Sequence, residues 1–190
     1  KAKDYAAFFK MRLTLLVVIS AVLSYFLAAP AFEVLPLLAL VIGGILVTGS
    51  SNGFNQIMER ELDKHMKRTQ NRPLPTGRMS VTEALILASV SGVLGILLLY
   101  FGLNPFSGIL GGLALFMYVA LYTPMKRISP WAVFVGAFPG AIPPMLGYVA
   151  VTGEFGLIPG ILFFVQFMWQ FPHFWAIAWK AHEDYQKAGY

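Results

Sequence analysis

Long apolar runs recur along the chain and are separated by shorter polar stretches. The runs cover residues 13–29, 35–54, 82–101, 105–122, 131–151 and 156–179. Each approaches or exceeds the roughly 17–25 residues that a helix needs to cross a bilayer. Backbone groups inside a bilayer must be bonded within helices or closed barrels, and barrel strands alternate in polarity. The pattern therefore predicts an all-α, polytopic membrane bundle with six transmembrane helices.

The composition agrees with this class and excludes several others. The chain is 57% hydrophobic and 12% charged, whereas soluble domains carry about 25% charged residues. Cysteine is absent, which excludes disulfides and cysteine metal sites. The first run and the following "LAAPA" also resemble a secretory signal, but five further runs follow it. Because the chain opens at Lys1 and stops at Tyr190 beside a charged segment, we expect one partial domain spanning 1–190.

All 14 basic residues fall on one side of the predicted bundle. They are Lys1, Lys3, Lys10 and Arg12, then Arg60, Lys64, Lys67, Arg68, Arg72 and Arg78, then Lys126 and Arg127, and finally Lys180 and Lys187. The opposite loops carry only Glu33 and Glu154 as charges. The positive-inside rule places the basic side, including the N-terminus, in the cytoplasm. This topology accounts for the net charge of +5 without a nucleic-acid partner.

The end of the second run carries an acidic ladder. Asn55, Glu59 and Asp63 are spaced i, i+4, i+8, and Lys67 continues the row if the helix extends past the membrane surface. Successive members are about 6 Å apart along the axis, which suits oxygen ligands that share divalent cations. Mg²⁺ is commonly held by one or two carboxylates together with substrate phosphates.

Basic residues follow the ladder directly. Lys67, Arg68 and Arg72 precede "RPLPTGR", which stops the helix. Guanidinium groups suit phosphate oxygens, so acids and bases together favour a metal-bridged diphosphate. A solvated helix end with i, i+4 ion pairs, such as Asp63 with Lys67, remains the alternative.

The last run carries a second polar stripe. Gln166, Gln170 and His173 recur at i, i+4, i+7, and we expect them to face the bundle interior. Interhelical hydrogen bonding of the glutamines and simple packing of the histidine remain alternatives. Glu183 and Asp184 form a second acidic pair beyond this run.

The segment between the fourth and fifth runs faces the same side. "YTPMKR" places Tyr122, Lys126 and Arg127 there, and Lys180 follows the sixth run. The fifth run is rich in proline and glycine, so we expect a bent helix that leaves room for a flat ligand. Together these features predict a cavity that opens to the cytoplasm.

These motifs resemble a known superfamily. "NQIMERELDKHMKRTQNRPLPTGR" is similar to the first Asp-rich signature of the UbiA-type intramembrane prenyltransferases. "YTPMKR", "GAFPGAIPPMLGY", "FPHFWAIAWKAHEDYQKAG" and the opening "FKMRLTLLVV" resemble its protohaem IX farnesyltransferase branch. Met11 replaces the usual proline, and Glu59 stands where many members have aspartate. The resemblance implies a nine-helix fold of which this chain supplies six.

The resemblance implies transfer of farnesyl from farnesyl diphosphate to a vinyl group of haem B, giving haem O and pyrophosphate. By the same resemblance, Mg²⁺ would be held by Asn55, Glu59, Asp63, Glu183 and Asp184, the diphosphate by Lys67, Arg68, Arg72, Lys126, Arg127 and Lys180, and the haem by His173 and Tyr122. It also implies a multi-pass protein of the inner membrane, associated with haem A synthase or a terminal oxidase. Alternatives are a UbiA-type enzyme acting on an aromatic or quinone precursor, a cation-coupled transporter and a scaffold protein.

Overall fold

Helices make up all the regular secondary structure of residues 1–182, the part of the chain that the computed structural model describes. The elements are α1 (Ala2–Phe8), α2 (Met11–Ala28), α3 (Val34–Met58), α4 (Arg60–Asp63), α5 (Val81–Gly102), α6 (Pro105–Phe116), η1 (Met117–Tyr122), α7 (Thr123–Met125), α8 (Ala132–Thr152) and α9 (Leu157–Lys180). Six segments in the described range are long and apolar enough to cross a membrane, with α6, η1 and α7 forming one of them. The predicted all-α membrane bundle is confirmed.

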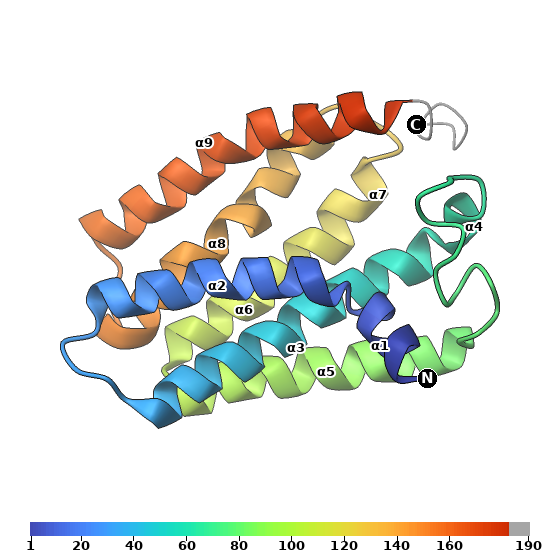
Figure 1. Cartoon of the computed structure of the whole chain (residues 1–190). Helices are drawn as coiled ribbons and strands as arrows, with labels where there is room; N and C mark the ends of the chain where they lie inside the picture. The colour runs from blue at the N-terminus through green and yellow to red at the C-terminus, as the bar shows by residue number, and fades with distance from the viewer. Residues whose placement is uncertain (183–190) are drawn as a thin grey trace.

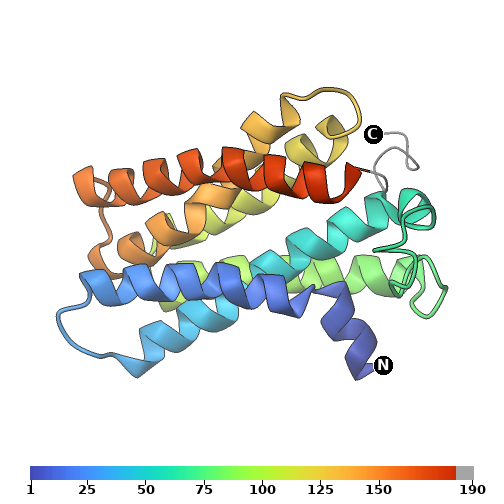
Figure 2. The same cartoon turned by 45° about the horizontal axis from the view of Figure 1, so that its top comes forward.

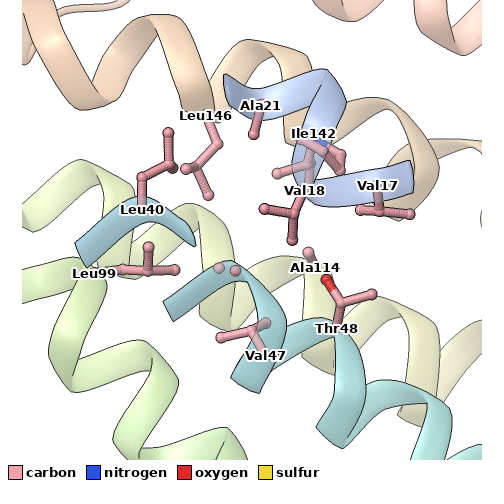
Figure 3. A pocket seen from close by; sticks show the side chains of 13 residues that line it. Val17, Val18, Ala21, Leu40, Val47, Thr48, Leu99, Ala114, Ile142 and Leu146 are labelled. Atoms are coloured by element: carbon pink, nitrogen blue, oxygen red, sulfur yellow. The ribbon is translucent and has the colours of Figure 1, made fainter. Parts of the chain in front are cut away.

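The long helices pack side by side around a shared apolar core. α3 lies along α5, α2 lies along α8, and α8 also carries α9 on its other side (Figure 1). The core between them encloses a small apolar cavity of about 50 Å³, lined by Leu40, Val47, Leu99, Ile142 and Leu146 among others (Figure 3). Five helices contribute to this cavity, so its walls depend on the whole arrangement.

The polar segments gather at one end of the bundle, as predicted. Residues 1–10, 59–80, 123–131 and 180–182 lie together there, and both views show the connections at 29–33 and 153–156 at the opposite end (Figures 1 and 2). We call the first end the basic end because the described lysines and arginines lie on it.

The prolines of α8 leave a main-chain carbonyl without its helical donor, and a side chain of α9 bonds to it. α8 contains Pro139, Pro143 and Pro144, and a proline cannot donate a backbone hydrogen bond. The carbonyl of Gly140, four residues before Pro144, therefore lacks its normal helical donor. Gln170 Nε2 of α9 donates to this oxygen at 3.3 Å. The interhelical role considered for Gln170 is confirmed.

Candidate active site

The acidic ladder is present and lies inside the protein. α3 ends just before Glu59, whose φ of −96° interrupts the helix before the short α4. The main-chain bonds from Glu59 N to Asn55 O and from Asp63 N to Glu59 O keep the i, i+4 spacing, at 3.0 and 2.9 Å. Asn55, Glu59 and Asp63 are only 2%, 5% and 0% exposed. This burial excludes the alternative of a solvated helix end.

The predicted continuation of the row to Lys67 is wrong. α4 ends at Asp63, and the chain then turns through a series of bends instead of remaining helical. Lys67 is exposed, and the ion-pair partner of Asp63 is Arg72 rather than Lys67. The helix stops there because the following segment turns back over the basic end to reach α5 (Figure 1).

Each of the three oxygen-bearing side chains accepts a hydrogen bond from a cation. The pairs are Lys10 Nζ with Asn55 Oδ1 at 3.1 Å, Arg72 Nη1 with Asp63 Oδ2 at 2.7 Å, and Lys126 Nζ with Glu59 Oε1 at 2.7 Å. We call these six residues the buried cluster. Its cations come from three separate segments, so the fold rather than local sequence assembles it. Charge-assisted bonds of this length are strong because little water screens them.

Lys10 is the member that sequence reasoning missed as a site residue. Burial, followed by the nearby charges of Arg72 and Lys126, lowers its pKa to about 7, against the opposing effect of Glu59 and Asp63. In the sequence, the positive-inside rule already accounted for a lysine at this position, so no role in the site was predicted for Lys10. The signal that pointed to it was its place in the opening "FKMRLTLLVV".

The buried cluster has the chemistry expected for Mg²⁺ that arrives with a phosphate. Asp63 Oδ1 and Asn55 Nδ2 are buried and have no hydrogen-bond partner among the described residues. Within residues 1–182, no three His, Cys, Asp or Glu side chains lie together as a metal site. Two carboxylates and an amide suit a cation that keeps waters and takes further ligands from its substrate. The predicted second pair, Glu183 and Asp184, lies outside the described residues.

The remaining predicted phosphate ligands lie apart from the buried cluster. Lys67, Arg68 and Lys180 line a hollow of about 890 Å³ at the basic end. Arg127 is exposed on the turn after α7. Of the predicted diphosphate-binding side chains, the structure therefore brings Arg72 and Lys126 to the ladder and groups three others elsewhere.

Tyr122 lies beside the buried cluster. Its ring is 8% exposed, and its centroid is 5.6 Å from Lys126 Nζ, 5.1 Å from the Tyr118 ring and 5.7 Å from the Phe174 ring. It ends the π-helical segment η1, a rare geometry that often marks functional sites. An aromatic face in this position can interact with a cation.

His173 does not pack between the helices that the structure describes, and the prediction that it faces the interior of the bundle stays a prediction. His173 is exposed, and its ring lies 6.4 Å from Trp169 and 6.2 Å from Phe174. The reason is that α9 packs mainly against α8, and this narrow contact is occupied by Gln170. Among the described helices, the polar stripe is therefore only partly internal.

The matching family model gives the class of protein. The model described as the UbiA prenyltransferase family matches residues 17–190, and the chain belongs to this family. The fold is similar to that of a UbiA homolog from Archaeoglobus fulgidus bound to DMAPP and Mg2+, with a TM-score of 0.79 and 16% identity over 98% of this chain and 66% of that one. At this identity the comparison establishes the fold.

Curated relatives are more specific. The chain is 52% identical over 187 residues to a Protoheme IX farnesyltransferase of Christiangramia forsetii, covering 98% of this chain and 62% of the relative. It is 50% identical to the Cytophaga hutchinsonii protein of that name, covering 99% and 67%. The human mitochondrial Protoheme IX farnesyltransferase is 40% identical over 95% of this chain and 41% of its own length. The chain thus spans about 62–67% of these bacterial relatives.

Proposed function

We propose that the protein containing this chain transfers a farnesyl group from farnesyl diphosphate to a vinyl group of haem B, giving haem O and pyrophosphate. The names of relatives at 47–52% identity support this acceptor and donor. The observation that carries the chemistry is the buried cluster, where three cations meet two carboxylates and an amide.

Mg²⁺ belongs to the same proposal. Asn55, Glu59 and Asp63 would hold it, together with Glu183 and Asp184 beyond the described residues. UbiA homolog structures of the same fold that are bound to Mg2+ with DMAPP or GPP support this assignment. When bound, Mg²⁺ would neutralise the diphosphate and make it a better leaving group.

The cations of the buried cluster would act directly on the diphosphate. Arg72 and Lys126 would exchange their carboxylate partners for phosphate oxygens and stabilise the charge that grows as the allylic C–O bond breaks. Lys10 would add a third donor from the start of α2. The vinyl group would attack C1 of the farnesyl cation, water would add to the carbocation left on the haem side chain, and the proton released from that water would pass to solvent. The ring of Tyr122 beside Lys126 would shelter the farnesyl cation.

The proposed setting is the inner membrane, with the basic end in the cytoplasm. The described lysines and arginines of this end supply the positive-inside signal. Passage of the product to a haem A synthase or to terminal oxidase assembly is also part of the proposal.

The test uses the full-length protein with haem B, labelled farnesyl diphosphate and Mg²⁺. We expect haem O, no product after EDTA, and a loss of turnover on the order of 10²–10³-fold in Asp63→Asn. Glu61→Gln is the matched control, because Glu61 lies on the same short helix but is exposed. Absence of haem O from the unaltered protein, or full turnover in Asp63→Asn, would refute the proposal.

A further inference from the structure

A tight turn at residues 8–10 joins α1 to α2 and carries Lys10 of the buried cluster. Lys10 has a φ of 47° and a ψ of 53°, a left-handed conformation that a residue with a Cβ seldom adopts. α1 ends at Phe8, and the carbonyl groups in the last turn of a helix have no donor within that helix. The backbone of this turn therefore needs hydrogen-bond donors from other segments.

Three buried side chains supply these donors. Gln56 Nε2 of α3 donates to the carbonyl oxygen of Phe8. Thr14 Oγ1 of α2 donates to Phe9 O at 2.7 Å, and Asn52 Nδ2 of α3 donates to Thr14 Oγ1 at 3.2 Å. Thr14, Asn52 and Gln56 are 0%, 3% and 0% exposed, so bulk water does not compete for these bonds. We call these three residues the turn clamp.

The turn clamp and the hydrogen-bond acceptor of Lys10 share one helix. Asn52 and Gln56 lie four residues apart on α3, and Asn55, which accepts from Lys10 Nζ at 3.1 Å, lies between them. A lysine stem is flexible, so the place of its ammonium group depends on where its backbone is held. Because α3 holds the turn and also carries Asn55, it fixes the distance between them.

We propose that Thr14, Asn52 and Gln56 are positioning residues, which hold the backbone of Lys10 where its ammonium group can bind the diphosphate of the prenyl donor. The inference rests on the proposed function, which gives Lys10 that role. The three side chains act through Lys10 and do not touch the substrate. Their substitution should therefore weaken substrate binding only while the lysine is present.

Apolar packing of the same turn does not replace the turn clamp. Phe8 is fully buried beside Ile57 and Leu74, and this contact keeps α1 against the bundle. Burial of apolar surface has no preferred direction, whereas a hydrogen bond weakens steeply away from its preferred angle. The bonds to the carbonyl groups of Phe8 and Phe9 therefore set the orientation of the turn, and the buried phenyl ring supplies stability.

The test is the binding of labelled farnesyl diphosphate with Mg²⁺ to the full-length protein, without haem B. Lys10→Met should weaken binding on the order of 10–100-fold, as for a lost hydrogen bond to a charged group. Gln56→Met keeps the length of the side chain but removes its donor, and it should weaken binding about tenfold because the ammonium group is misplaced. Added to Lys10→Met, it should cause no further loss, because residues that act through one another are not additive.

Thr14 supplies a second and nearly isosteric test. Thr14→Val removes the hydroxyl group and should weaken binding about three- to tenfold, whereas Thr14→Ser keeps it and should bind like the unaltered protein. Ser50→Ala is the matched control, because Ser50 is also fully buried on α3 but donates to Ala88 O of α5 at 2.7 Å. It removes a buried hydrogen bond of the same kind without touching the turn, so binding should stay unchanged.

Thermal unfolding of each variant in detergent separates misfolding from misplacement of Lys10. An equal loss of binding from Gln56→Met with and without Lys10 would show a general structural role and would overturn the proposal. Unchanged binding in Lys10→Met, or in both Gln56→Met and Thr14→Val, would overturn it as well. If Gln56→Met does not fold, the comparison of Thr14→Val with Thr14→Ser decides, since loss of binding in both or in neither contradicts the role of the hydroxyl group.

This proposal and the proposed function fail separately. If the effect of Gln56→Met disappears in Lys10→Met but no haem O forms, the turn clamp is supported and the proposed acceptor is wrong. If haem O forms while the two substitutions weaken binding independently, the reaction is supported and the turn clamp is wrong.

Discussion

Gly147 of α8 faces the main chain of α2 with no room for a side chain. A Cβ at this position would overlap the carbonyl oxygen of Ala21 and lie 2.7 Å from its carbonyl carbon and 2.9 Å from its Cα. The obstructing atoms are backbone, so no rotamer change relieves the overlap. Gly147→Ala therefore requires α2 to move away from α8.

That movement would loosen the centre of the core. Ala21 and Tyr25 of α2 pack in one cluster with Ile142 and Leu146 of α8. Overpacking of a core typically costs about 1–3 kcal/mol, and a rigid backbone obstruction belongs to the upper part of this range. We expect Gly147→Ala to lose about 2–3 kcal/mol of stability. Turnover should also fall, because α2 begins directly after Lys10 of the buried cluster.

The assay is thermal unfolding of the full-length protein in detergent, followed by tryptophan fluorescence, with turnover measured on the same samples. Gly160→Ala is the control because its Cβ meets nothing within 4 Å and its position lies within α9. Alanine is favoured over glycine inside a helix by up to about 1 kcal/mol, so this variant should unfold at or above the midpoint of the unaltered protein. Equal midpoints for Gly147→Ala and the unaltered protein would refute the close α2–α8 contact.

Two further outcomes follow from the charges. Lys126→Gln removes the ammonium group whose Nζ lies 2.7 Å from Oε1 of the buried Glu59 carboxylate, and it should destabilise the protein by about 1–3 kcal/mol. The double variant Glu59→Gln/Lys126→Gln should recover part of this loss in the same thermal unfolding assay. The hydrogen bond from Arg78 lowers the pKa of Asp4, so its contribution to holding α1 exists above the ordinary pKa near 4 and is lost as the pH falls through the lowered value. The protection factors of the α1 amides, which are exchange rates corrected for the pH dependence of intrinsic exchange, should therefore be constant from neutral pH to about 5 and fall below about 4. Asp4→Asn should show the lower protection already at neutral pH, and a variant whose protection still falls with pH as in the unaltered protein would contradict the assignment to Asp4.

The hydropathy of the sequence predicts the membrane-spanning helices well, because every backbone polar group in lipid must be hydrogen-bonded within the protein and a long apolar run therefore forms a helix. The predicted run 35–54 corresponds to α3, and 82–101 to α5, with ends displaced by only a few residues. The π-helical turn Met117–Tyr122 was not predictable, because "MYVALY" is equally apolar in any helical register. The break at Glu59 was missed for a similar reason, since no proline or glycine marks it.

Only those site residues that lie on one helix could be predicted to lie together, because their spacing along the sequence fixes their relative positions. Asn55, Glu59 and Asp63 share a face because i, i+4 positions always do in a helix. Their cationic partners Lys10 and Lys126 lie 45 and 67 residues away from the side chains that they contact. Such contacts depend on how α2 and α7 are placed against α3, which no local pattern encodes.

Lys10 has a backbone conformation that lysine does not favour, so the chemistry of its side chain explains why a lysine occupies this position. Its φ of 47° and ψ of 53° are left-handed, which costs about 1–2 kcal/mol for a residue with a Cβ and nothing for glycine. This turn lets α1 fold back so that Phe8 is fully buried, a gain of about 1.5–3 kcal/mol that offsets the strain. Gln56 Nε2 secures the turn by donating to the carbonyl of Phe8. Glycine would make the same turn without strain but would remove the cation from Asn55, and strain retained in this way is typical of functional positions.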